Sequence, residues 1–234
     1  MCGRYAATRS AAALAETYAA AAPAAELPPS WNVAPTSEVY AVVERAGRDG
    51  GPVTRQIRTV RWGLVPSWAK DTSGAARLIN ARSETAAGKP SFRKALTSRR
   101  AIIPADGYFE WQKKPGGSKQ PFYLHTSDSG GVSFAGLYEL WRDDAVPGED
   151  PAAWLWTATI LTTESAGPLR DIHHRTPLTV PQGAWADWLN PAAEASPADL
   201  LAMLEPAANV MSARPVGPAV GNVRNNGAHL LDPA

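Results

Sequence analysis

Short apolar runs of β-branched and aromatic residues recur along the chain and predict a protein built mainly of β-strands. The predicted strands cover residues 38–43, 53–62, 101–104, 107–111, 121–125, 132–138 and 154–162. Polar clusters of Gly, Pro and Asp separate them, as in G-R-D-G-G-P (47–52) and K-K-P-G-G-S-K (113–119). Loops of this length and composition indicate hairpins in an antiparallel sheet or barrel.

Helical patterns are fewer and predict short helices between and after the strands. We expect helices over residues 10–22, 91–98, 164–170, 183–189 and 197–205. Ser10, Ser91 and Ser196 precede three of these segments and are suited to N-cap them. Segment 144–152 is expected to be an exposed loop rather than a domain boundary, because strand-like sequence resumes directly after it. These patterns favour one α+β domain.

An Ala-rich stretch near the N-terminus resembles a secretion signal only superficially. Glu16 and Thr17 interrupt its apolar residues, and Leu14 with Tyr18 forms the i,i+4 pair of an amphipathic helix. No apolar run approaches the roughly 20 residues that cross a bilayer. The single cysteine among 234 residues excludes an internal disulfide and fits a reducing compartment. We therefore expect a cytoplasmic protein without membrane contact.

The net charge of +1 hides an asymmetry between the two halves of the chain. Residues 1–125 contain 18 Lys and Arg against 9 Asp and Glu, whereas residues 126–234 contain 5 against 13. Arg supplies 17 of the 23 cations, and its guanidinium suits bidentate phosphate contacts. If the halves stay apart in space, the basic half predicts a surface for a polyanion. If they interleave, the charges cancel.

The only cysteine, Cys2, follows the initiator methionine directly, at a position where side chains are usually exposed. Methionine aminopeptidase removes Met1 when the second residue is small, so we expect a mature chain that begins with a 1,2-aminothiol. An α-amine has a pKa of about 7.7–8.0 and is far more often unprotonated than a lysine. It can condense with an aldehyde, after which the neighbouring thiol can close a thiazolidine ring. An inert, exposed cysteine is the alternative.

The stretch L-I-N-A-R-S-E-T (78–85) places a dense polar run behind an apolar pair. Asn80 could position a substrate oxygen, and Arg82 could bind a phosphate. A strand end with solvated side chains is the alternative interpretation.

Glu110 lies between two aromatic residues in G-Y-F-E-W (107–111). Strand alternation turns its carboxyl away from both rings, either toward solvent or into a polar pocket. In a pocket beside apolar rings its pKa would rise, which suits a general acid or base near neutral pH.

The stretch D-I-H-H-R-T-P-L (171–178) contains two adjacent histidines. Neighbours on a strand point to opposite faces, so this spacing does not indicate a metal site. One histidine is expected to face inward as a proton shuttle while Arg175 faces substrate, although a lone histidine is more often structural.

W-G-L-V-P-S-W (62–68) places two tryptophans around a loop broken by Gly and Pro, within the basic half of the chain. Aromatic side chains on loops can stack on unpaired bases. Trp68, close to Lys70, is the first candidate for an exposed tryptophan.

Six motifs in order resemble the SRAP family, the SOS-response-associated peptidase-like abasic-site sensors. They are M-C-G-R-Y (1–5), W-N-V-A-P-T (31–36), R-W-G-L-V-P-S-W-A-K-D (61–71), I-N-A-R-S-E-T (79–85), R-R-A-I-I-P-A-D-G-Y-F-E-W (99–111) and I-H-H-R-T-P (172–177). Each motif alone is weak, but six in order are specific. The resemblance spans residues 2–181 and leaves a compatible C-terminal helix and tail over 182–234.

The resemblance implies a fold and a reaction. The fold is a single α+β domain over residues 1–234, mainly an antiparallel, barrel-like sheet with flanking helices. The reaction is covalent capture of abasic sites in single-stranded DNA through the N-terminal Cys2. It needs no cofactor or metal, the protein is expected to be a monomer, and when bound to DNA it would be associated with the nucleoid. A strand-cleaving lyase side reaction and autocatalytic removal of Met1 are also implied.

Residue by residue, the resemblance implies a catalytic set of Cys2, Asn80, Glu110 and His173. It implies a DNA-binding set of Arg4, Asn32, Trp68, Arg82, Ser83 and Arg175. The sequence departs from the family at Thr176, where Met is usual, and at His174, where Asp is common. We expect these departures to affect only details of the DNA groove.

Three other functions remain open on the sequence. Cys2, His173 and Glu110 could serve a true cysteine peptidase. M-C-G also opens N-terminal-nucleophile amidohydrolases, although the later motifs do not resemble those enzymes. Finally, the protein could bind single strands passively, with an inert Cys2.

Overall fold

The computed structural model describes residues 2–47, 51–127, 130–147 and 150–234. Its strands are β1 (Tyr5–Ala7), β2 (Ser30–Val33), β3 (Glu38–Arg45), β4 (Thr54–Trp62), β5 (Asn80–Arg82), β6 (Arg100–Ala105), β7 (Gly107–Lys113), β8 (Lys119–His125), β9 (Val132–Arg142), β10 (Trp154–Glu164), β11 (Arg175–Thr179), β12 (Glu205–Pro206) and β13 (Ser212–Pro215). The helices are α1 (Ala11–Tyr18), α2 (Ser83–Ala86), α3 (Arg93–Ser98), α4 (Trp185–Leu189) and α5 (Pro197–Ala202).

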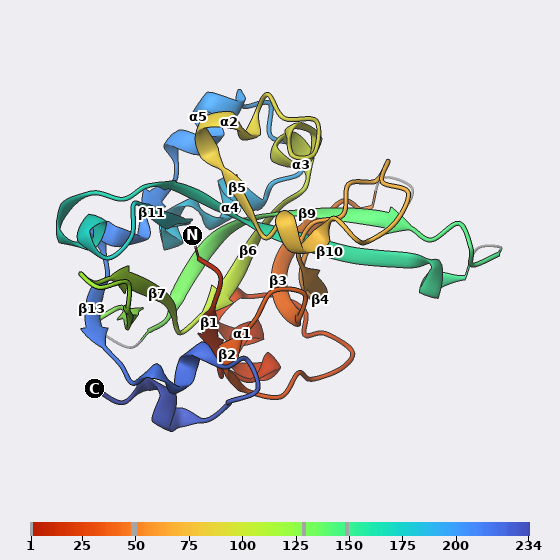
Figure 1. Ribbon diagram of the computed structural model, residues 1–234. Helices are drawn as coiled ribbons and strands as arrows, with labels where there is room; N and C mark the ends of the chain where they lie inside the picture. The colour runs from red at the N-terminus through yellow and green to blue at the C-terminus, as the bar shows by residue number, and fades with distance from the viewer. Residues whose placement is uncertain (1, 48–50, 128–129, 148–149) are drawn as a thin grey trace.

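The strands form two sheets (Figure 1). The smaller sheet has the order β13-β8-β7-β1-β2, and the larger has the order β12-β11-β9-β6-β3-β4-β10-β5. Because β9 also pairs with β10, strands β9, β6, β3, β4 and β10 close into a ring. The predicted α+β fold with a barrel-like sheet is therefore confirmed. The sheet is mixed rather than purely antiparallel, since β10 runs parallel to β4 and to β5.

The seven predicted strands are all present, with bounds shifted by a few residues. Both hairpins flanking the Gly-rich loops are antiparallel, β3 with β4 and β7 with β8. The predicted loop 144–152 joins β9 to β10, although its residues 148 and 149 lie outside the described residues. Figure 1 shows the far end of the β9–β10 hairpin projecting from the body of the protein.

The helix predictions are confirmed in part. Ser10 and Ser196 cap α1 and α5, and Ser196 forms a full capping box with Asp199. The predicted cap at Ser91 is wrong, because α3 begins after Phe92 without a side-chain cap. The helix predicted over 164–170 is also wrong, since β10 extends to Glu164 and only a 3₁₀ turn follows.

Two large apolar clusters lie on either side of the closed ring of strands. Helices α1, α3, α4 and α5 pack on the first cluster through residues such as Leu14, Leu96 and Trp188. The second cluster contains Cys2 together with side chains from β1, β4, β7 and β9. Among the described residues, no helix has the length and apolar character that a membrane crossing needs.

Strands from both halves of the chain alternate within the larger sheet. In its order, β11, β9 and β10 come from the acidic half, and β6, β3, β4 and β5 come from the basic half. Segments from both halves therefore contribute to one sheet and do not form two separate bodies.

Candidate active site

Cys2 is fully buried in the second apolar cluster, where Tyr5, Trp62, Tyr108 and Phe134 surround it. The exposure expected of a chain end is therefore wrong for this residue. The rings of Tyr5 and Trp62 meet edge to face, with centroids 5.1 Å apart. Burial raises the pKa of the Cys2 thiol, because the interior disfavours the thiolate. The sulfur is held as a neutral thiol.

Asn80 holds the backbone of Cys2. Its Nδ2 donates a 2.7 Å hydrogen bond to the Cys2 carbonyl oxygen. Strand β5 presents this amide because it pairs with β10, where Ile160 lies opposite Asn80. The Oδ1 atom of Asn80 is buried and has no hydrogen-bond partner within the described part of the chain. The Asn80 Oδ1 atom can therefore still accept a hydrogen bond from a further donor beside Cys2.

Glu110 is 4% exposed, and burial raises the pKa of its carboxyl. Of the two alternatives for Glu110, the structure therefore shows the buried one, and the pKa shifts in the direction expected for it. Strand alternation also holds, since Phe109 and Trp111 pack in a third cluster on the opposite side of β7. The carboxyl Oε1 lies 3.9 Å from Nδ1 of His173. A buried carboxyl that is protonated more readily than usual can donate and accept protons near neutral pH.

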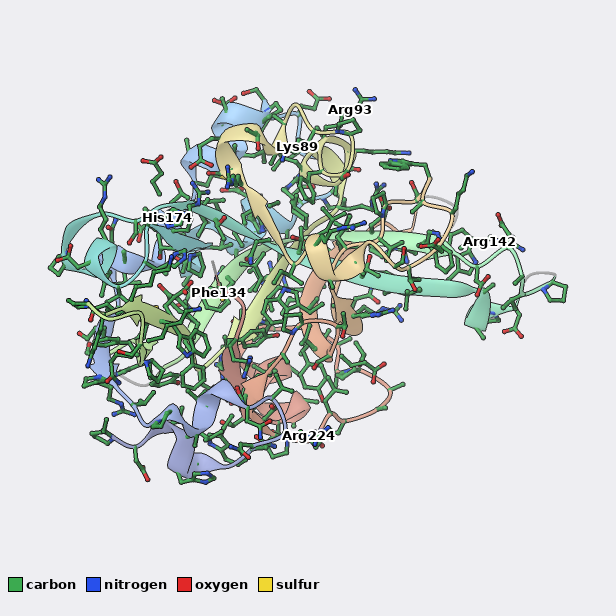
Figure 2. All side chains as sticks on the ribbon, in the orientation of Figure 1. Lys89, Arg93, Phe134, Arg142, His174 and Arg224 are labelled. Atoms are coloured by element: carbon green, nitrogen blue, oxygen red, sulfur yellow. The ribbon has the colours of Figure 1, made fainter. Side chains whose placement is uncertain are left out.

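His173 is half-buried beside Glu110, and burial lowers its pKa to about 4. Its Nδ1 accepts a 3.0 Å hydrogen bond from the backbone N–H of Arg175. The same Nδ1 lies 3.2 Å from the Arg175 carbonyl oxygen, so the tautomer of the ring decides whether Nδ1 accepts from the Arg175 N–H or donates to this oxygen. His174 stacks on this ring, with centroids 4.4 Å apart, and is itself exposed (Figure 2). The expected opposite orientation of the two rings is therefore wrong, because both precede the first residue of β11.

Arg175 is 6% exposed and lies against Glu84. Its Nη1 and Nη2 donate to the two Glu84 carboxylate oxygens over 2.9 and 3.0 Å, and Nη2 also donates to the Thr162 carbonyl oxygen over 2.7 Å. Most of its donors are engaged within the protein. The predicted contact of Arg175 with phosphate stays a prediction.

Arg4 and Asn32 lie together under the C-terminal segment. Arg4 Nη1 donates to Asn32 Oδ1 over 2.7 Å and to the Val220 carbonyl oxygen over 2.8 Å. Asn32 is 5% exposed, and its Nδ2 donates to the carbonyl oxygens of Val220, Asn222 and Asn225. The structure therefore gives both side chains intramolecular partners, while the backbone of Arg4 forms a hydrogen bond with the Cys2 thiol.

Trp68 is 66% exposed, which confirms its expected exposure. Together with Lys70 and Arg77 it lines a cavity of about 360 Å³. Arg82 is exposed at the end of β5, and Ser83 is half-buried at the start of α2. Both follow Asn80 closely along the chain, and Arg82 places an exposed cation two residues after it.

Two residues of the site were missed on the sequence. Tyr108 and Thr176 are each 1% exposed, and their hydroxyl oxygens lie 3.2 Å apart. Tyr108 belongs to the apolar cluster that contains Cys2. Alternation along β7 places Tyr108 on the side of Glu110, and this signal could have found it. Thr176 is buried, and the expectation that it affects only details of the DNA groove stays a prediction.

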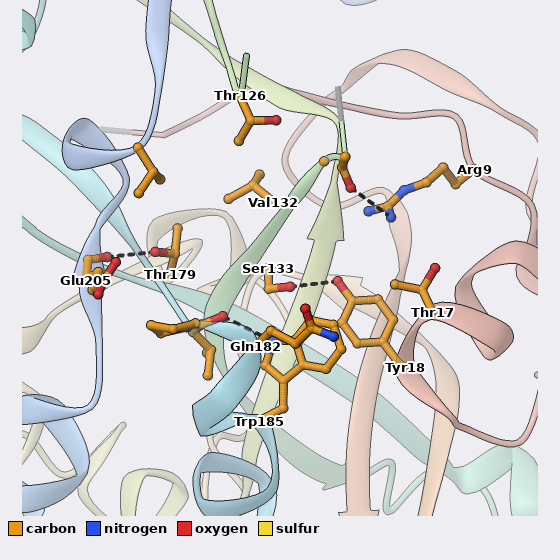
Figure 3. Close-up of a pocket in the computed structure, with 15 residues that line it drawn as sticks. Arg9, Thr17, Tyr18, Thr126, Val132, Ser133, Thr179, Gln182, Trp185 and Glu205 are labelled. Carbon is orange, nitrogen blue, oxygen red and sulfur yellow. Dashed lines mark hydrogen bonds between the residues drawn. The ribbon is translucent and has the colours of Figure 1, made fainter. Parts of the chain in front are cut away.

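A cavity of about 370 Å³ lies elsewhere, between α1 and the segment that follows β11 (Figure 3). Tyr18, Ser133 and Trp185 line it, and the Tyr18 hydroxyl bonds to Ser133 Oγ over 2.8 Å. None of the catalytic set borders this cavity, so its volume does not mark the candidate site. Across the described residues, no group of three or more His, Cys, Asp or Glu side chains could hold a metal ion.

Residues 1–223 match the family model described as SOS response associated peptidase (SRAP). The chain belongs to the SRAP family. Among its relatives is "Abasic site processing protein YoaM" of Bacillus subtilis, 39% identical over 212 residues that cover 90% of this chain and 87% of the relative. "Abasic site processing protein HMCES" of Mus musculus is 31% identical over 238 residues, covering 88% of this chain and 65% of the relative.

Solved structures share the SRAP fold of this chain. A Bacteroides thetaiotaomicron protein superposes with a TM-score of 0.81 over 100% of both chains, at 24% identity. A Bordetella bronchiseptica protein superposes with a TM-score of 0.71 at 28% identity, covering 92% of this chain and all of the other. The resemblance seen in the six sequence motifs is thereby confirmed at the level of family and fold.

Proposed function

We propose that this SRAP protein processes abasic sites in single-stranded DNA by linking them covalently to Cys2. One observation carries the proposal: Cys2, the residue that would supply the aminothiol, is held by Asn80 and is influenced by the charge of the buried Glu110, which in turn lies beside the half-buried His173. The printed names of the relatives, abasic site processing proteins, point to the same lesion. Loss of Met1 exposes the Cys2 amine and is a precondition of the reaction.

The first step joins the Cys2 amine to the open-chain aldehyde of an abasic deoxyribose. The amine nitrogen adds to the aldehyde carbon and gives a carbinolamine. Glu110 in its protonated form then donates a proton to the carbinolamine hydroxyl, which leaves as water. The products are an iminium ion and the Glu110 carboxylate. Its raised pKa favours the protonated form that this step requires.

The second step closes the ring. The Cys2 sulfur adds to the iminium carbon, and the electron pair of the carbon–nitrogen double bond moves to nitrogen. The thiol proton passes to the Glu110 carboxylate, which restores the acid. Because burial raises the pKa of the thiol, no separate thiolate forms beforehand, and proton transfer and carbon–sulfur bond formation belong to one step. The product is a thiazolidine.

His173 assists from the other side of Glu110. In the tautomer that carries its proton on Nε2, the neutral ring can donate a hydrogen bond to the sugar while its Nδ1 accepts from the Arg175 backbone N–H. Burial lowers its pKa to about 4, so it remains neutral at physiological pH. We assign it the role of a hydrogen-bond donor during opening of the sugar ring.

The DNA strand is proposed to follow the surface around Asn80. Arg82 and Ser83 lie next to Asn80 on the chain, and exposed Trp68 offers a face for a neighbouring base. Arg4, Asn32 and Arg175 complete the proposed DNA-binding set, with contacts that require some of their present hydrogen bonds to rearrange. A lyase side reaction, autocatalytic loss of Met1, a monomeric state and a cytoplasmic, nucleoid-associated location are parts of the same proposal.

The neutral thiol disfavours the cysteine-peptidase alternative. A peptidase nucleophile acts as a thiolate, and neighbouring positive charge normally lowers its pKa. Here burial and the charge of Glu110 both raise it. The proposed reaction of the Cys2 amine and thiol with an aldehyde needs no preformed thiolate.

An adduct assay tests the proposal. Protein that begins with Cys2, as confirmed by intact mass, is mixed with single-stranded DNA carrying one abasic site. We expect an adduct that survives denaturation, and none with DNA lacking the lesion. Cys2→Ala retains the amine and should give only an adduct that requires borohydride reduction to persist. If wild-type protein forms no stable adduct, the proposal fails.

A further inference from the structure

Two buried hydroxyl groups face each other at the edge of the Cys2 cluster. The Tyr108 Oη atom lies 3.2 Å from the Thr176 Oγ1 atom, and each residue is only 1% exposed. Tyr108 belongs to β7 in the smaller sheet, and Thr176 belongs to β11 in the larger sheet. The hydrogen bond therefore joins the two sheets at the site.

Both residues are tied to the catalytic set. Tyr108 precedes Glu110 by two residues on β7, so their side chains leave the strand on the same side. Tyr108 also shares the apolar cluster of Cys2. Burial raises the pKa of Tyr108, a bond to Thr176 opposes this, and charge on Cys2 or Glu110 raises it further. The phenol is thus a neutral hydroxyl that senses charge on both reacting groups.

The bond between the hydroxyls can run in either direction. When Thr176 donates to Tyr108, the proton of the phenol is available to a third atom. Thr176 has a weak alternative acceptor, the Pro177 carbonyl oxygen at 3.5 Å, to which it can donate when Tyr108 is the donor. The pair therefore has two states, and only one leaves the phenol proton free for the site.

We propose that Tyr108 is a further catalytic residue and that Thr176 is its positioning residue, both acting on ring closure; this inference rests on the proposed function. Within the ring-closing step, transfer of the thiol proton to the Glu110 carboxylate runs ahead of carbon–sulfur bond formation, so partial negative charge develops on sulfur until the bond to carbon is complete. The Tyr108 hydroxyl donates a hydrogen bond to this sulfur and keeps its proton throughout. Thr176 donates to the phenol oxygen and holds the phenol in the donating state.

The assay separates the two chemical steps. With abasic single-stranded DNA, borohydride added at intervals traps all iminium, and denaturation without reductant reports closed thiazolidine only. Tyr108→Phe and Thr176→Val each remove one hydroxyl from a side chain of matched shape. Thr176→Ser restores the hydroxyl. Tyr138→Phe, a buried tyrosine of the same apolar cluster, is the matched control.

We expect Tyr108→Phe and Thr176→Val to form iminium at the wild-type rate and to close the ring about threefold to tenfold more slowly, the worth of one hydrogen bond. Thr176→Ser and Tyr138→Phe should match wild type. Ring closure at the wild-type rate in Tyr108→Phe overturns the inference alone, and so does a Thr176→Ser protein as slow as Thr176→Val. Absence of both adducts in wild type overturns the proposed function and the inference with it.

Discussion

Replacing Asn32 by Ala should destabilise the fold and release the C-terminal segment. The change removes the acceptor of Arg4 Nη1 and the donor to three backbone carbonyl oxygens of residues 220, 222 and 225. Each such bond contributes about 0.5–1.5 kcal/mol, and the carbonyls near the surface regain water in the variant. We therefore expect a loss of about 2–4 kcal/mol in the free energy of unfolding. For a chain of this length that corresponds to a fall in Tm of roughly 4–16 °C.

Urea denaturation and thermal melting measure the loss, and limited proteolysis reports release of the C-terminal segment. Asn209→Ala is the matched control, since Asn209 is exposed, and it should change stability by less than about 0.5 kcal/mol. If Asn32→Ala unfolds like wild type but binds single-stranded DNA more weakly, the structural role argued here is refuted and Asn32 acts on DNA alone.

Three further changes test other parts of the account. Glu110→Gln removes the buried acid and should slow adduct formation by about 10²-fold or more. A time course of quenched samples measures the rate of adduct formation. An unchanged rate contradicts the role of Glu110 as proton donor and acceptor. The pKa of Glu110 is raised in the folded protein, so ionisation of its carboxyl as the pH rises lowers the free energy of unfolding. Glu110→Gln cannot ionise and should therefore lose less stability than wild type between acid and neutral pH. His173 behaves in the opposite sense, because folding lowers its pKa from 6.5 to about 4. The free energy of unfolding should therefore decline as the pH is lowered from 6.5 to about 4. Urea titrations should show a smaller decline over this range in His173→Gln. Arg100 is 2% exposed and donates to the carbonyl oxygens of Leu96, Thr97, Trp188 and Asn190. Arg100→Met should therefore lower the free energy of unfolding by about 3 kcal/mol or more. A calorimetric Tm equal to that of wild type would show that these carbonyl oxygens find other partners.

The strands and their hairpins could be predicted because local sequence determines them. β-Branched and aromatic runs bounded by Gly-rich loops gave seven strands with bounds close to those observed. The short strands β1, β2, β5, β11, β12 and β13 were missed, since two to five residues carry too little pattern. Their pairing depends on partners far along the chain, as β5 depends on β10.

The proposed catalytic set follows from the resemblance of its motifs, but its environment could not be predicted from the sequence. Nothing in M-C-G-R-Y indicates that Cys2 is buried, because its neighbours come from β4, β7 and β9. Arg175 was misleading in another way. A cation in a polar motif suggests a phosphate contact, whereas the Arg175 guanidinium is bound by Glu84, which lies 91 residues away in the sequence. Residue spacing within a motif cannot predict a contact between residues this far apart in the sequence. Thr176 was a noted departure whose meaning emerged only from its contact with Tyr108.

The central claim is that Cys2 reacts through both its amine and its thiol. Mass spectrometry of the N-terminal peptide from the purified adduct, after digestion of protein and DNA, tests this most directly. The account predicts a peptide that begins with Cys2, carries the sugar remnant, and has neither an amine open to acylation nor a thiol open to alkylation. A sugar remnant on a lysine, or on Cys2 with its thiol still free to alkylate, would contradict it.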